Sequence, residues 1–112
     1  MTAAITAYEG DTLSIQVSFY DVDQTTAVTP NSGLTWTLTD GYGTVMNSRT
    51  AVSLSSSTSV WIELTGNDLI VGSSGKDRLI LVSGTYDSVT HGNGRHIRRE
   101  IPFTIIDAVN VS

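Results

Sequence analysis

Three aspartates stand where the pattern of the chain changes from strand to loop, and they are the first candidates for chemistry. Asp21 and Asp23 directly follow an alternating segment that ends at Tyr20, and Asp87 precedes His91 in a second polar segment. If the two loops meet at one pole of the fold, these carboxylates would offer the oxygen ligands that Ca²⁺ prefers. Ca²⁺ takes about six to eight oxygens, however, and the chain has no EF-hand pattern. Acidic residues at strand ends usually cap local backbone amides instead. We therefore predict no metal and keep the three aspartates as the calcium candidates.

The side chains that could act as bases or nucleophiles do not form a catalytic pattern. His91 and His96 are the two histidines, and both are expected in or beside a hairpin tip. Gly72-Ser73-Ser74-Gly75 lacks the Gly-x-Ser-x-Gly spacing of a nucleophile elbow. Gly41-Tyr42-Gly43 lacks the third glycine of a phosphate-binding loop. We predict no catalytic residue, no cofactor and no enzymatic activity.

A basic cluster occupies five consecutive positions and contains Arg95, His96, Arg98 and Arg99. Such a cluster can dock on an acidic surface of a partner protein. It can equally keep an edge strand from pairing with other chains, because charges on an edge discourage aggregation. Nucleic-acid binding is disfavoured, since aromatic side chains are not interleaved with these residues. The docking and anti-aggregation interpretations both remain open.

The two tryptophans are predicted to have different roles. Trp36 shares the parity of the apolar residues in its alternating segment, so it is assigned to the core. Trp61 has the opposite parity from its apolar neighbours, and we expect it to point outward as an interface anchor. The alternative is that a loop such as residues 55–59 folds over it, or that the register shifts and buries it. Trp61 and the basic cluster are together the predicted interface residues.

The hydrophobic pattern indicates the scaffold that must position these side chains. Apolar residues alternate with polar or small ones, which predicts strands with one buried face. Two such sheets must cover each other, so the predicted fold is an all-β two-sheet sandwich. The expected strands are 3–8, 12–20, 34–39, 44–47, 49–54, 59–65, 78–86 and 96–107, with a helical turn at 67–69 and a hairpin tip at 87–95. The inward parity assigns to the core Leu13, Ile15, Val17, Phe19, Leu34, Trp36, Leu38, Val60, Ile62, Leu64, Ile101, Phe103 and Ile105.

Two features of the last two predicted strands leave alternatives open. Residues 79–82 are apolar on both parities, so either Leu79 and Leu81 or Ile80 and Val82 face inward. Pro102 cannot donate a hydrogen bond to a ladder, so the last strand is expected to be an edge strand or to carry a bulge there.

Composition narrows the class of protein further. The chain has 112 residues, a net charge of −5 and no cysteine. That length predicts one domain over residues 1–112, and the missing cysteines exclude disulfides and thiol chemistry. The acidic balance disfavours nucleic acid and anionic membranes as partners. The N-terminus lacks the pattern of a signal peptide, and no apolar run reaches the ~20 residues of a membrane span. We expect a product made in the cytoplasm.

Several segments resemble immunoglobulin-like domains. Tyr8-Glu9-Gly10-Asp11-Thr12 leads into an alternating strand, and Leu34-Thr35-Trp36-Thr37-Leu38-Thr39-Asp40 forms the next such segment. Gly84-Thr85-Tyr86-Asp87-Ser88 is followed by Ile101-Pro102-Phe103-Thr104-Ile105. Together they resemble the small immunoglobulin-like structural proteins of tailed bacteriophage particles, over nearly the whole chain. The resemblance implies an immunoglobulin-like sandwich of about seven to eight mostly antiparallel strands and a location in the virion. The inter-sheet disulfide of antibody domains is absent, and the family has no catalytic residues to carry over.

Two hypotheses for function follow from these observations. The first is a virion structural protein, most simply a capsid decoration or cement protein or another accessory head or tail component. It would bind coat protein or head–tail proteins in many copies, where modest interfaces add up through multivalency. The second is a carbohydrate- or cell-surface-binding module that uses loops at one pole. That module would rely on Asp21, Asp23, Tyr42 or His91.

Overall fold

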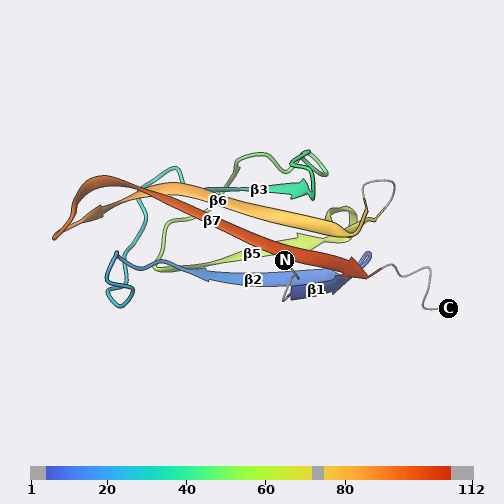
Figure 1. Cartoon of the computed structure of the whole chain (residues 1–112), viewed down its shortest axis with the longest axis horizontal. Coiled ribbons are helices and arrows are strands. Elements are labelled where there is room, and N and C mark those ends of the chain that lie inside the picture. Colours follow the sequence, from blue (N-terminus) through green and yellow to red (C-terminus); the bar gives the residue numbers. More distant parts are fainter. Residues whose placement is uncertain (1–4, 72–74, 107–112) are drawn as a thin grey trace.

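The computed structural model describes residues 5–71 and 75–106, and this part of the chain is almost entirely β (Figure 1). Its strands form two sheets, and a single 3-10 turn is the only helical element in these residues. The all-β prediction is therefore confirmed. The elements are β1 (Ile5–Tyr8), β2 (Thr12–Ser18), β3 (Thr35–Asp40), β4 (Val52–Ser53), β5 (Ser59–Thr65), η1 (Gly66–Leu69), β6 (Asp77–Ser88) and β7 (Gly92–Ile106).

The larger sheet has five strands in the order β1-β7-β6-β3-β4, and the smaller sheet pairs β2 with β5. All pairings are antiparallel except that of β1 with β7, which is parallel and matches Ile5 with Phe103. The two sheets lie one above the other in Figure 1. The parallel contact of β1 was not foreseen, because alternation along a strand carries no information about the direction of its partner.

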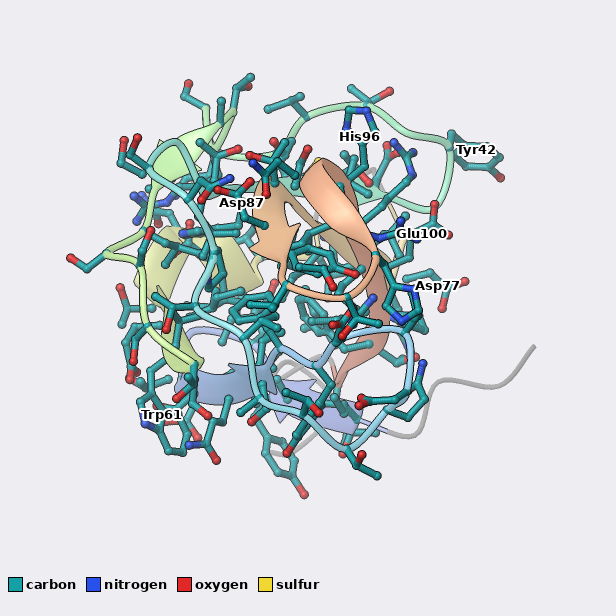
Figure 2. All side chains as sticks on the ribbon, turned by 90° about the vertical axis from the view of Figure 1, so that its left-hand side faces the viewer. Tyr42, Trp61, Asp77, Asp87, His96 and Glu100 are labelled. Carbon is teal, nitrogen blue, oxygen red and sulfur yellow. The ribbon has the colours of Figure 1, made fainter. Side chains whose placement is uncertain are left out.

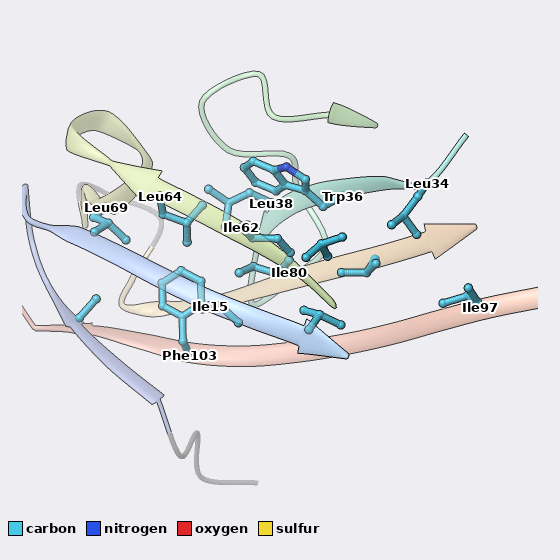
Figure 3. Packing of buried hydrophobic residues seen from close by; sticks show 14 of the residues in the cluster. Ile15, Leu34, Trp36, Leu38, Ile62, Leu64, Leu69, Ile80, Ile97 and Phe103 are labelled. Carbon is cyan, nitrogen blue, oxygen red and sulfur yellow. The ribbon is translucent and has the colours of Figure 1, made fainter. Parts of the chain in front are cut away.

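Apolar side chains from both sheets fill the space between them (Figure 3). Of the thirteen residues predicted in the core, eleven are buried, and Leu13 and Ile101 are only partly buried. Leu13 belongs to a two-stranded sheet, and Ile101 lies on a stretch of β7 that is paired on one side only, so solvent reaches both. The ambiguous run on β6 resolves with Ile80 and Val82 inward.

The segment between β3 and β4 differs most from the predicted strands. Residues 44–47 form no strand, and only one bridge joins Val45 to Thr39. The strand expected over 49–54 is reduced to β4. Asn47, Ser48 and Ala51 have φ values of 51°, 57° and 48°. Positive φ is incompatible with an extended strand, so the chain here turns repeatedly.

The last hairpin is longer than predicted, and its tip is shorter. β6 continues to Ser88 and β7 begins at Gly92, so the expected tip of 87–95 shrinks to three residues. Gly92 and Gly94 have φ values of 106° and 69°, which glycine adopts without steric cost and which allow so tight a return. The register shift of this ladder lies between Tyr86 and Ser88, not at Pro102.

Candidate functional site

The β6–β7 hairpin extends past the end of the smaller sheet, and this overhang carries most of the predicted site residues (Figure 1). β6 and β7 have 12 and 15 residues, whereas β2 and β5 have 7 each. The loop that follows β2 lies against the overhang, where a bridge between Tyr20 and Ala27 closes its base. The hairpin and this loop therefore meet at one end of the molecule, as the sequence predicted.

Asp21 fastens the loop to the hairpin. Its carboxylate accepts hydrogen bonds from the hydroxyl of Ser88 at 2.6 Å, the hydroxyl of Tyr86 at 3.3 Å and the backbone amide of Val22 at 2.8 Å. The side chain is buried, with 7% of the residue exposed. The Ser88 hydrogen bond is the largest influence and lowers the pKa of Asp21, and burial opposes it only in part. Asp21 is thus an ionised structural anchor.

The other two calcium candidates are also engaged locally. Asp23 accepts hydrogen bonds from the hydroxyl of Thr26 and from the amides of Thr26 and Thr25, and these, the hydroxyl most of all, lower its pKa to about 2. Asp87 accepts hydrogen bonds from the amide of Gly94 at 2.8 Å and from Asn31 Nδ2 at 3.3 Å.

All three aspartates and His91 line one depression of about 510 Å³. Within residues 5–71 and 75–106, no three acidic, histidine or cysteine side chains are arranged to hold a metal ion. The carboxylates here satisfy backbone and hydroxyl donors, as turn-forming aspartates do.

The basic cluster is divided between the two faces of β7. Cross-strand partners share a face, and Arg95 and Arg99 lie opposite the buried Tyr86 and Val82. The side chains of these two arginines therefore lie on the core-facing side of the larger sheet, at a part of β7 that the smaller sheet does not cover. His96 and Arg98 lie on the outer face, where Arg98 forms an exposed ion pair with Glu100 at 3.7 Å. The sequence predicted one patch, and the pleat of the strand makes two rows.

A groove runs between the inward row of arginines and the loop after β2. Its volume is about 540 Å³, and Tyr20, Val22 and Gln24 line it opposite Arg95 and Arg99. Tyr20 and Val22 are 43% and 45% exposed. Among the described residues, Asp21 is the only acidic one in the lining, and its carboxylate is already hydrogen-bonded by the hairpin. The groove thus combines an apolar rim with cationic donors.

Sequence reasoning missed the three loop residues of this groove. The one available signal was an exposed aromatic residue, Tyr20, immediately after the buried Phe19. The alternation of apolar and polar residues gave no indication that Tyr20 would lie across a groove from Arg95 and Arg99, more than seventy positions later in the chain.

The backbone of β7 is paired on both sides only near its end. The Ile105 amide bonds to the Lys76 carbonyl, so odd-numbered residues of β7 direct their backbone groups toward β6. The Ile106 carbonyl accepts from Glu9, so even-numbered residues face the opposite side. β1 covers that side over residues 103–106. Within the described part of the chain, no strand pairs with the edge formed by His96, Arg98 and Glu100. Pro102 belongs to this same side, where its missing N–H leaves the β6 ladder intact.

Trp61 lies on the smaller sheet and is not part of the hairpin or the groove. It is on the outward face of β5, opposite Gln16, and is 56% exposed, so the predicted orientation is confirmed and the loop of residues 55–59 does not cover it. In the end view of Figure 2, Trp61 lies at the smaller sheet, on the other side of the molecule from His96. Tyr42, which is 93% exposed, lies far from Trp61 in the same view. Tyr42 and Trp61 therefore do not combine into one sugar-binding platform.

The histidines do not assemble a catalytic group in the described residues. No hydrogen bond joins the imidazole of His91 or of His96 to a hydroxyl or a carboxylate there. The backbone of His91 takes part instead, since its amide bonds to Ser88 Oγ and its carbonyl accepts from Arg95.

Comparisons with known protein families, with curated proteins and with solved structures found no match for this chain. None of the helical structure in residues 5–71 and 75–106 has the length and apolar character that a membrane crossing requires.

Proposed function

We propose that this protein is a binding module that joins a larger protein assembly, with the free edge of β7 as its main contact. The observation that carries the proposal is an edge of β7 that no strand within residues 5–71 and 75–106 pairs with at His96–Glu100, on an overhanging hairpin and flanked by exposed basic side chains. An exposed edge is a template for strand addition, in which a partner's extended segment forms backbone hydrogen bonds with it. Charged side chains along this edge discourage pairing with unrelated strands, so we propose one specific partner.

We further propose an immunoglobulin-like sandwich for the two sheets. Taking β2, β3, β5, β6 and β7 as strands B, C, E, F and G reproduces the B–E and C–F–G pairings of that fold. β4 then takes the place of C′ beside C. β1 departs from an entirely antiparallel arrangement, since it adds in parallel to the G strand.

The assembly that we propose is a tailed-bacteriophage particle, in which the protein is an accessory head or tail component such as a capsid decoration protein. The support is the resemblance of the sequence segments described above, together with the sandwich topology. Many copies on a symmetric particle would allow a small edge contact to act through multivalency. Trp61, which projects from the opposite sheet, would supply a second contact.

Co-sedimentation tests this proposal directly. The wild-type protein is mixed with purified capsids or coat protein of the bacteriophage whose genome encodes it, and we expect it to sediment with them. Arg98→Pro removes one edge-facing amide and spares the β6 ladder, so it should abolish the interaction. Arg98→Ala is the matched control that removes the charge and keeps the amide. Failure of the wild-type protein to co-sediment with head or tail components would contradict the proposal.

A further inference from the structure

We infer that the strand added to β7 is an acidic segment with the pattern acidic–x–apolar–x–acidic, whose inward side chains enter the groove beside Tyr20. This inference rests on the proposed strand addition and names the chemistry of the partner. It follows from which side chains of β7 share a face with the groove.

The register of an added strand is determined by the edge groups of β7. The edge offers the backbone donors and acceptors of His96 and Arg98, so a partner strand would be centred there. Its side chains would alternate between the outer face and the groove face. On the groove face they would meet Arg95, Ile97 and Arg99 in turn, since neighbouring side chains of paired strands lie about 4.5–5.5 Å apart.

The charges on the groove face select acidic residues at the two outer positions. Arg95 donates to Tyr86 and to the carbonyl of His91, and Arg99 makes only a 3.5 Å contact with the carbonyl of Arg98. In the described residues neither arginine is paired with a carboxylate. Guanidinium groups have five donors in a planar fork and bind carboxylates in two-pronged fashion. Two arginines four residues apart therefore match two acids at the same spacing.

The middle position favours an apolar residue. Ile97 lies between the two arginines on this face but is already buried in the core, so the apolar contact would come from the partly exposed Tyr20 and Val22 on the rim of the groove. The pattern reads the same in both directions, so it suits a parallel or an antiparallel partner. The outer face is less selective, because Arg98 and Glu100 present opposite charges side by side.

Synthetic heptapeptides test the inference by titration into the isotope-labelled protein, with backbone amide NMR shifts as the readout. The first peptide is Ser-Glu-Thr-Val-Thr-Glu-Ser, which places both glutamates and the valine on one face. The second, Ser-Thr-Glu-Val-Glu-Thr-Ser, has the same composition with the glutamates on the opposite face from the valine. The third replaces both glutamates of the first with glutamine.

We expect the first peptide to bind at least about tenfold more tightly than the other two, because charge-assisted hydrogen bonds are roughly twice as strong as neutral ones. Shifts should be confined to residues 94–100 and to the loop residues 20–24. Arg99→Gln should reduce the preference for the first peptide over its glutamine version, and Arg98→Pro should abolish binding of all three. The amide spectrum of each variant reports whether its fold is retained, and His96→Pro replaces Arg98→Pro if the latter does not fold.

The outcomes separate the two proposals. Equal affinity for all three peptides, lost in Arg98→Pro, would support strand addition and overturn the acidic pattern. Selective binding of the first peptide that survives in Arg98→Pro would show an acid-binding groove without strand addition and overturn the proposed function. No shift with any peptide at millimolar concentration would overturn both.

Discussion

Replacing Asp68 with alanine should destabilise the protein more than any other single loss of a charged side chain that we describe. Asp68 lies in η1, and its side chain has no exposed surface. Its carboxylate accepts hydrogen bonds from Arg49 at 2.8 and 3.1 Å, from Asn47 Nδ2 at 2.8 Å and from the Thr65 amide at 3.0 Å. One residue thus joins the irregular loop before β4 to the end of β5.

The magnitude follows from what the substitution leaves behind. Removing one partner of a buried ion pair costs about 3–5 kcal/mol. Arg49 is 36% exposed and stacks over the Trp36 ring at 5.8 Å, so water can reach the guanidinium and reduce that cost. The Thr65 amide also loses its charged acceptor, at about 1–3 kcal/mol for a buried group left unsatisfied, whereas the exposed side chain of Asn47 can bond to water instead. We expect a net loss of about 3–4 kcal/mol, against a total stability of roughly 5–15 kcal/mol.

Urea unfolding followed by circular dichroism measures this loss. Asp11→Ala is the matched control, because Asp11 is exposed and its side chain makes no hydrogen bond in the described residues, and it should change the free energy of unfolding by less than about 0.5 kcal/mol. Arg49→Met should cost about 2–3 kcal/mol, because it leaves the fully buried carboxylate of Asp68 without its counter-ion and with only the donors of Asn47 and Thr65. If Asp68→Ala and Asp11→Ala have the same unfolding midpoint, the buried anchor does not contribute as we reason.

Three other predictions test separate parts of the structure. Burial raises the pKa of Asp68, but the donors around it outweigh burial, and the pKa values of Asp68, Asp21 and Asp40 all lie below the ordinary value. The stability that these carboxylates contribute is therefore fully present above their unfolded pKa of about 4, and it is lost as the pH falls through their pKa values in the folded state. Urea midpoints that rise on acidification below pH ~4 would contradict this expectation. Gly84→Ala places a Cβ 2.9 Å from Leu34 Cδ1 and 3.4 Å from its Cα, and should cost about 1–3 kcal/mol by overpacking, which thermal melting would report as a lower midpoint. Trp61→Ala should leave stability within about 0.5 kcal/mol of the wild type, whereas Trp36→Ala should cost about 3–5 kcal/mol; equal midpoints for the two variants would refute their assignment to the outside and the core.

Alternation along the chain was enough to predict the longer strands and their buried faces, although not the irregular segment around β4. Ser59–Thr65 was predicted with the bounds that β5 has, and the 3-10 turn after it was expected at nearly the same residues. The inward parity of Ile15, Val17 and Phe19 and the outward parity of Trp61 are also correct. These features are local: a strand has a period of two whatever pairs with it, so the residues themselves carry the information.

Pairing between distant segments decided the features that matter for the candidate site. The parallel contact of β1, the overhang of the hairpin and the groove beside Tyr20 all depend on which strands become neighbours, and on where a partner strand ends. The basic cluster is an example, because its composition was evident from the sequence but its division was not. The pleat of β7 places Arg95 and Arg99 on the opposite face from His96 and Arg98, and the shortness of the smaller sheet leaves the first pair open to the groove. Likewise, Asp68 was visible only as a residue of a helical turn, and its role as an anchor arises because the loop of Arg49 folds back onto it. Contacts across long sequence separations depend on the packing of the whole chain, which no local pattern encodes.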